Sequence, residues 1–296
     1  MSFKRRFDSI KVLKEQTLYK KCLLPDIKSG VVFPAVRNNR MDFYYMGGKL
    51  FSFDNKNLFS THLKYASVAI GESLGPYVTE EDIKEISIAN FVDGYERIKE
   101  NCAKHSGKEA EGVSQIYGKY SCARSNVDDV VVLDIEVSLR KEDDEYAIEL
   151  NKTSRAGSDR MDLLMFDTVS GELRFFEAKH HSNGDLRARH GKPKIIGQMN
   201  RYSSQLQANT VYSEIIDAYK KHVKAINDLL EPDKKLPEPK AINPNPCLLI
   251  FGYDSEQKRK LKDYVGQYGD TDFSVYTIGN IKAVNARTLF SAAKKH

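Results

Sequence analysis

The chain has 296 residues, of which 41% are hydrophobic and 29% charged, as is typical of a soluble globular protein with one large domain or two modest ones. The formal net charge of +5 is compatible with a polyanionic partner but does not select for one. The longest apolar runs are far too short to cross a bilayer, so we expect no membrane partner. The basic segment Met1–Phe7 is not followed by an apolar run, so we expect no secretory signal.

The four cysteines are scattered along the chain, and no two form a CxxC pair. This spacing argues against a structural zinc site and against a disulfide framework. We therefore expect reduced thiols in a cytoplasmic protein. The cysteines are Cys22, Cys102, Cys122 and Cys247.

The first third of the chain is predicted to be rich in β-strand. Two aromatic-rich runs, 41–46 and 49–53, flank Gly47 and Gly48, which supply the positive φ angles of a tight hairpin. The GGK sequence here lacks the other features of a phosphate-binding loop, so a plain turn is favoured.

A helix is predicted to follow over 79–104. Thr79 is a capping residue, three carboxylates follow it, and apolar residues then recur near helical spacing. We assign residues 1–105 to a β-rich N-terminal region plus this helix, with a recognition or interaction role. A protein-interaction role would also suit a chain that acts with partner subunits.

Residues 106–296 are predicted to form an α/β domain with a mixed sheet. The closing strand, helix and strand predict parallel strands joined by a crossover helix. A loop over 231–246 holds five of the nine prolines, so it is neither helix nor central strand. The expected strands are 129–139, 160–166, 172–180, 247–253 and 273–278, and the expected helices are 109–120, 195–206, 211–230 and 255–268.

Carboxylates interrupt three of these predicted strands, although Asp and Glu are depleted in strands and costly to bury there. Asp134 and Glu136 alternate on one face of the first strand, and Asp162 lies inside an apolar run of the second. Period-two geometry places Glu177 and Lys179 on one face of the third. A short turn at Ser170–Gly171 would bring Asp162 near that pair.

Such a cluster suits Mg²⁺ or Mn²⁺, since Mg²⁺ prefers oxygen ligands and keeps several waters. Two carboxylates and a backbone carbonyl can hold the ion against a phosphodiester, where it lowers the pKa of water and offsets charge. A neighbouring lysine can orient or deprotonate that water and stabilise developing charge.

The pattern Asp162, then Glu177-Ala178-Lys179, then Gln198-Met199-Asn200-Arg201-Tyr202 on a helix resembles the PD-(D/E)xK nuclease superfamily. The second part resembles the QxxxY element of its RecB-like and Cas4-like branch. The resemblance covers about residues 109–278 and implies a restriction-endonuclease-like mixed sheet flanked by helices. No proline precedes Asp162, which departs from the family pattern.

The resemblance also implies roles for individual residues. Asp162, Glu177 and the Ala178 carbonyl would be metal ligands, and Lys179 would activate water. Gln198 and Tyr202 would line the site, and a glutamate of the preceding helix would complete the set. Glu111, with Gln115 four residues on, or Glu109 matches that glutamate, and Asp159 competes with Asp162. Apart from the resemblance, Glu136 is a candidate ligand for a second metal.

The ExK tripeptide is a weak signal alone, because it also occurs at 238–240 and 256–258. The first copy lies in the proline-rich loop, and the second lies at a helix start, where i and i+2 point to different faces. Only Glu177-Ala178-Lys179 lies on a predicted strand, after an acidic strand and before QxxxY.

Several of these features have ordinary alternatives. Asp134 and Glu136 could be charges on a solvated edge strand, and Gln198 with Tyr202 could be a plain helical pair. His180 and His181 point to opposite faces and are interpreted as loop or surface residues. His190 belongs to the basic loop that follows them. The basic helix at 258–262 is interpreted as a solvated face. The basic loop and helix residues are either solvated or contact phosphate: Arg187, Arg189, Lys192, Lys194 and Arg201.

We therefore expect an α/β metal-dependent nuclease that hydrolyses phosphodiester bonds, with DNA as the substrate and RNA left open. The same family analogy suggests an endonuclease that acts with a partner protein in prokaryotic antiviral defence. A homo-oligomer is left open. The alternative hypothesis is a non-catalytic nuclease-fold scaffold or nucleic-acid-binding subunit of a multi-protein complex.

Overall fold

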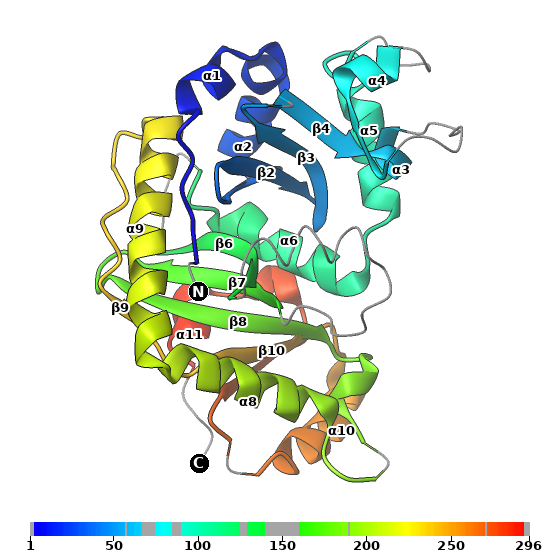
Figure 1. Cartoon of the computed structure of the whole chain (residues 1–296). Coiled ribbons are helices and arrows are strands. Elements are labelled where there is room, and N and C mark those ends of the chain that lie inside the picture. Colours follow the sequence, from blue (N-terminus) through cyan, green and yellow to red (C-terminus); the bar gives the residue numbers. More distant parts are fainter. Residues whose placement is uncertain are drawn as a thin grey trace. The chain divides into compact units, whose positions relative to one another are not determined.

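The computed structural model describes residues 3–56, 58–66, 75–84, 90–124, 129–139, 160–188, 190–269 and 271–292. The chain divides into two compact units. The first comprises residues 1–4, 128–220 and 237–296, and the second comprises residues 5–127 and 221–236. Each unit has its own multi-stranded sheet with helices beside it, so the protein is a mixed α/β structure (Figure 1).

The sheet of the first unit has the strand order β11-β10-β8-β7-β6, and β9 pairs with β8 beside this path. Strands β6, β7 and β8 are antiparallel neighbours, whereas β10 runs parallel to both β8 and β11. The predicted mixed sheet with added parallel strands is therefore confirmed. The strands are β6 (Val130–Ser138), β7 (Arg160–Asp167), β8 (Glu172–His180), β9 (Ala241–Ile242), β10 (Cys247–Phe251) and β11 (Ser274–Ile278).

The central strands of this sheet are buried along most of their length. All five residues of β10 are buried, as are seven consecutive residues of β8. Continuous apolar runs are expected where helices cover both faces of a sheet. The helices of this unit include α8 (Lys194–Gln207), α10 (Ser255–Gly266), α11 (Ala286–Phe290) and the start of α9 (Asn209–Leu230), and the 3₁₀ turns are Gly184–Leu186 and Ile281–Ala283.

The crossover between β10 and β11 begins with a well-defined helix cap. Asp254 accepts a hydrogen bond from the Gln257 backbone, and the Gln257 side chain accepts one from the Asp254 backbone. This reciprocal capping box satisfies two backbone donors at the start of α10. The helix start explains why Glu256-Gln257-Lys258 is not a strand-borne ExK motif.

The sheet of the second unit is an antiparallel meander in the order β1-β2-β3-β4-β5. Its core is aromatic, with Phe51 packed against Phe59, Phe91 and Tyr95. The predicted strands of this region are therefore present, but they lie among helical segments, so the region is mixed α/β and not β-rich. The strands are β1 (Phe33–Val36), β2 (Arg40–Tyr45), β3 (Gly48–Asp54), β4 (Leu58–His62) and β5 (Tyr77–Thr79).

Two predictions for this unit need correction. The chain opens with helical segments that were not predicted, and the expected helix over 79–104 is two helices, with 85–89 outside the described residues. A run of turn residues at 91–94 separates them. The helices are α1 (Ile10–Glu15), a π-helical segment (Tyr19–Leu23), α2 (Leu24–Ser29), α3 (Leu63–Ala66), α4 (Glu80–Lys84), α5 (Tyr95–Lys104) and α6 (Lys108–Tyr120).

The predicted hairpin is present, but its turn is shifted by one residue. Tyr45 pairs with Gly48, so Met46 and Gly47 form the two-residue loop. Both have positive φ angles, 51° and 78°, as a type I′ turn requires. Gly47 also lies close to Ala110, since a Cβ added at Gly47 would lie 2.3 Å from the Cβ of Ala110.

Replacing Gly47 by alanine is expected to destabilise the protein by about 2 kcal/mol or more, because strain and a clash combine. Gly107→Ala is the matched control, since a Cβ at Gly107 would meet no atom within 4 Å. Chemical denaturation of both variants measures the difference. Equal stabilities would contradict the close approach.

Candidate active site

Three carboxylates lie in one row across β6, β7 and β8. Ile135 pairs with Leu163 and Val137 with Met161, which sets Glu136 opposite Asp162. Leu163 pairs with Phe176, so Asp162 faces Glu177 on the next strand. Directly opposed residues of antiparallel strands project to the same face, so the predicted neighbourhood of Asp162 and Glu177 is confirmed.

The row lies where β7 and β8 separate. The pairing of these strands ends at Leu163 and Phe176, and from there β8 continues beside β10. The backbone N–H of Ala178 instead donates to Asp162 Oδ2 at 2.7 Å. Asp162 therefore caps the open end of the ladder with its side chain.

Glu177 is 2% exposed and is surrounded by hydrogen-bond donors. Its Oε1 accepts from Lys179 Nζ at 2.5 Å and from Gln198 Nε2 at 2.9 Å. The hydroxyl of Tyr202 lies 3.3 Å from its Oε2. These contacts confirm that Glu177 and Lys179 share one face, and that α8 presents Gln198 and Tyr202 to it.

Gln198 and Tyr202 form more than a plain helical pair. Gln198 Nε2 donates to the Tyr202 oxygen at 2.7 Å, and the Tyr202 hydroxyl donates to the Arg160 carbonyl at 2.7 Å. Tyr202 is fully buried. One hydrogen-bonded chain therefore connects α8, the start of β7 and the carboxylate of Glu177.

Glu136 has an unusual backbone for a strand residue. Its φ angle is +50°, in the left-handed region that L-residues rarely adopt. A bulge precedes it, because the pairing shifts between Val132 and Asp134. Bulges and strained residues next to a site redirect side chains. Glu136 is half-buried, and its Oε2 lies 3.8 Å from Nη1 of Arg160.

The solvated interpretation of Asp134 is wrong. Asp134 is 0% exposed, and its Oδ2 accepts from the Tyr219 hydroxyl of α9 at 2.9 Å. Its Oδ1 accepts from the Ile135 backbone at 2.8 Å. Asp134 is thus a buried residue that fixes the irregular backbone leading into Glu136.

Burial and neighbouring negative charge set the protonation of the row. Burial raises the pKa of Asp162 well above its usual value, and Glu177 and Glu136 raise it further, against a smaller opposing effect of Lys179. Burial also raises the pKa of Glu177, although Lys179, Tyr202 and Gln198 oppose the rise. Burial and mutual repulsion therefore disfavour the fully ionised row, whose negative charge Lys179 only partly offsets.

This excess charge predicts a stability gain in Asp162→Asn. A carboxyl whose folded pKa is raised stabilises the fold below its unfolded value of 3.8, and this contribution is lost as pH rises through the folded pKa. At neutral pH without divalent cations, we expect Asp162→Asn to gain about 1 kcal/mol, or ~2–4 °C in Tm. The asparagine oxygen can still accept from Ala178.

Thermal melts from pH 4 to pH 8 in EDTA test this prediction. The advantage of the variant should grow as pH rises. A variant that is less stable than the wild type throughout this range would contradict the charge argument.

The remaining predicted site residues are more dispersed. Glu111 and Glu109 lie in the first turn of α6, which belongs to the other unit, so the site described above does not include them. His180 pairs with Ser182 and packs against Phe251, on the opposite face of β8 from Glu177. Asp159, the competing acid, lies outside the described residues.

The predicted phosphate-contacting residues are exposed where the structure describes them. Arg187 lies over the ring of Tyr264 at 5.3 Å and donates to the His181 carbonyl. Lys192 and Arg201 are exposed, and Lys194 lies 3.9 Å from Asp185. Arg189 lies outside the described residues.

Sequence reasoning missed two residues that the geometry includes. Arg160 contributes its carbonyl to Tyr202 and its guanidinium to the neighbourhood of Glu136. Tyr219 holds Asp134 from α9. A basic residue at the start of an acidic strand was the available signal for Arg160, whereas Tyr219 was visible only as one residue of the predicted helix over 211–230.

Within the described part of the chain, no three His, Cys, Asp or Glu side chains converge closely enough to form a ready-made metal cluster. Glu177 is drawn toward Lys179 and Gln198, while Asp162 is engaged by Ala178. The Lys179 ammonium thus lies beside Glu177, where a metal cation would otherwise neutralise the Glu177 carboxylate. All four cysteines are free thiols, and no described helix is long and apolar enough to cross a membrane.

Comparisons of the chain with protein-family models, with curated proteins and with solved structures found no match.

Proposed function

We propose that this protein is a Mg²⁺- or Mn²⁺-dependent nuclease of the PD-(D/E)xK type, with DNA as its substrate. The observation that carries the proposal is the row of Glu136, Asp162 and Glu177 at the point where β7 and β8 separate, with Lys179 beside it. A structural role alone gives no reason to place three acids in opposed positions of one sheet face.

The chemistry of the row suits a hard divalent cation. Its donors are carboxylate oxygens, and burial together with Glu177 and Glu136 raises the pKa of Asp162, so a bound cation would stabilise its ionised form. Asp162, Glu177 and the Ala178 carbonyl would hold the ion, with Glu136 available to a second one. Such an ion supplies a Lewis acid for phosphodiester hydrolysis.

The chain's own groups have separate tasks in this proposal. Lys179 moves from Glu177 to the reacting phosphate, where its ammonium stabilises developing charge and holds or releases a proton at Nζ. Gln198 and Tyr202 keep the Glu177 carboxylate oriented after Lys179 leaves it. Exposed Arg187, Lys192 and Arg201 are available to backbone phosphates.

The free thiols suit a reducing compartment, so we place the activity in the cytoplasm. A partner protein and an antiviral role are part of the same proposal and rest on the sequence resemblance alone.

A non-catalytic, nucleic-acid-binding scaffold is the second candidate. The observation that favours it is the internal pairing of Glu177 with Lys179 and Gln198, which satisfies the acid without a metal. Buried ion pairs of this kind also occur as purely structural features.

One assay separates the two candidates. The purified full chain is incubated with supercoiled plasmid, linear duplex, single-stranded DNA and RNA, each with Mg²⁺, Mn²⁺ or EDTA. The nuclease proposal predicts cleavage of at least one DNA substrate that stops in EDTA. Binding without cleavage under every condition supports the scaffold, and cleavage that persists in EDTA overturns the metal site.

A further inference from the structure

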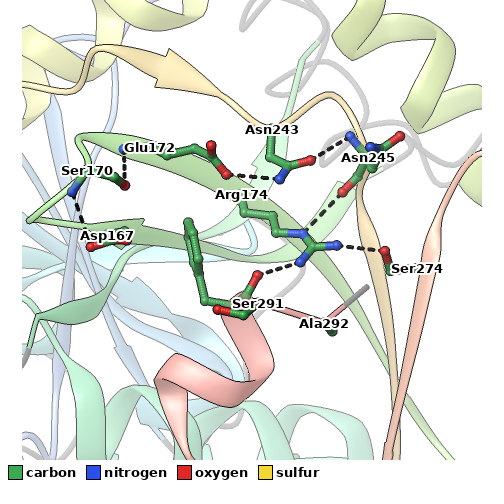
Figure 2. Close-up of a pocket in the computed structure, with 10 residues that line it drawn as sticks. Asp167, Ser170, Glu172, Arg174, Asn243, Asn245, Ser274, Ser291 and Ala292 are labelled. Atoms are coloured by element: carbon green, nitrogen blue, oxygen red, sulfur yellow. Dashed lines mark hydrogen bonds between the residues drawn. The ribbon is translucent and has the colours of Figure 1, made fainter. Parts of the chain in front are cut away.

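A polar cavity lies on the other face of β8. Side chains alternate along a strand, so Arg174 projects away from the face that carries Glu177 and Lys179. A cavity of about 420 Å³ opens there, which is within the usual range of small-molecule sites. Figure 2 shows its lining, which is mostly polar and includes Asp167, Glu172, Arg174, Asn243, Asn245 and Ser274.

Arg174 is 3% exposed and has only neutral partners. Its guanidinium donates to the Asn245 carbonyl at 3.2 Å, to Ser274 Oγ at 2.7 Å and to the Phe290 carbonyl. Burial lowers the pKa of Arg174, against smaller opposing effects of Cys247 and Glu172. None of the carboxylates that the structure describes lies within 4.0 Å of it as an ion-pair partner.

A structural role accounts for part of this arrangement. The Phe290 carbonyl lies at the end of α11, so Arg174 caps that helix terminus. The Asn245 contact fixes the loop before β10. Neutral carbonyl and hydroxyl acceptors satisfy these N–H groups, but within the described ranges no carboxylate forms a direct ion pair with the buried positive charge, which is costly.

The two carboxylates of the cavity differ in their charge balance. Asp167 forms an ion pair with Arg287 at 2.5 Å. Glu172, in contrast, accepts from the neutral Asn243 amide at 2.9 Å and forms no ion pair within the described ranges. The lining therefore presents one cation, Arg174, and one anion, Glu172, which act on each other electrostatically but form no ion pair within the described ranges.

We propose that this cavity binds a small zwitterion, an α-amino acid or a molecule that carries an amino-acid moiety. Its carboxylate pairs with Arg174 beside Ser274, and its ammonium pairs with Glu172. A simple anion would meet the Glu172 charge, and a simple cation would meet Arg174, so the charge pattern favours a ligand with both. The Asn245 side-chain amide, unused in the described contacts, can bond the ligand carboxylate.

Binding is tested by thermal-shift screening of the full chain against each common L-amino acid at about 10 mM. Calorimetry then compares the best-binding amino acid with its N-acetyl derivative, which lacks the ammonium, and with its amide, which lacks the carboxylate. Both derivatives are expected to bind at least about tenfold more weakly. Acetate and inorganic phosphate serve as simple anions.

The variants Glu172→Gln and Asn245→Ala probe the two ends of the cavity without removing the buried arginine. Glu172→Gln should weaken binding of the amino acid about tenfold and leave the affinity for its N-acetyl derivative unchanged. Glu238→Gln, at a side chain that is 71% exposed, is the control and should change neither of these two affinities. A melt of each variant in buffer confirms that it is folded.

Three outcomes would overturn the proposal. They are no response to any amino acid, binding of acetate or phosphate as tight as that of the best amino acid, and unchanged affinity in Glu172→Gln. Each can be read without a nuclease assay, so this inference stands or falls separately from the proposed activity.

Discussion

Lys179→Ala is expected to lower the proposed DNA cleavage by at least about 100-fold. The side chain is largely buried beside Glu177, and its ammonium is the described cation closest to that carboxylate. Its removal takes away the group that would stabilise charge on the reacting phosphate. Initial rates on supercoiled plasmid with Mn²⁺, at equal protein concentration, give the measurement.

Lys258→Ala is the matched control for this variant. Lys258 ends another ExK tripeptide, but it lies on α10, where it is exposed. Its removal should change cleavage by less than about twofold, because it has no place beside the acidic row. Equal activity of Lys179→Ala and wild type would show that the lysine has no catalytic task.

Asp42→Ala is expected to destabilise the second unit by about 3–5 kcal/mol. Asp42 is 1% exposed and accepts from Arg40 at 2.8 and 3.0 Å and from Ser52 at 2.7 Å. Arg37, itself buried, lies 3.7 Å away. Without the carboxylate, buried positive charge would be left uncompensated.

The pH dependence of this loss has a defined sign. Burial alone would raise the pKa of Asp42, but Arg40, Lys49 and Arg37 outweigh it and hold the pKa well below its usual value. A depressed folded pKa contributes stability above the unfolded value of 3.8, and this stability is lost as pH falls below it. The difference between the variant and wild type should therefore shrink in acid.

Denaturant titrations of Asp42→Ala and Asp228→Ala measure this contrast. Asp228 forms an exposed ion pair with Lys224 at 2.6 Å, so its loss should cost less than about 1 kcal/mol. Similar losses in the two variants would contradict the buried-charge argument.

The strands of the first unit could be predicted because their apolar runs are long and end at clear turn residues. Glu172–His180 matches its predicted bounds, and Gly171, with φ 79°, forms the turn before it. Period-two alternation then sufficed to place Glu177 and Lys179 on one face. Asp162 could be placed beside them because the connection between β7 and β8 is short.

The backbone at Glu136 could not be predicted in the same way. Strand propensity describes an extended chain, whereas this residue has a left-handed φ angle after a bulge. The contacts that hold this irregular segment come from Tyr219 on α9, far along the sequence. Long-range contacts of this kind leave no local pattern in the strand itself.

The missed helices at the start of the chain did leave a signal. Leu23 and Ile27 are buried at i, i+4 spacing, but Pro25 lies between them. Proline is tolerated in the first turn of a helix, and here it falls at the beginning of α2. Leu13 belongs to a separate short helix, so no single window showed a long helical stripe.

Mn²⁺ binding to the full chain tests the acidic row most directly. Electron paramagnetic resonance of free Mn²⁺ would be compared for wild type, Asp162→Asn and Glu177→Gln at neutral pH. We predict saturable binding by the wild type that is weakened at least about tenfold in each variant. Binding by the variants that equals the wild type, or no binding by any of the three, would contradict a metal centre at this row.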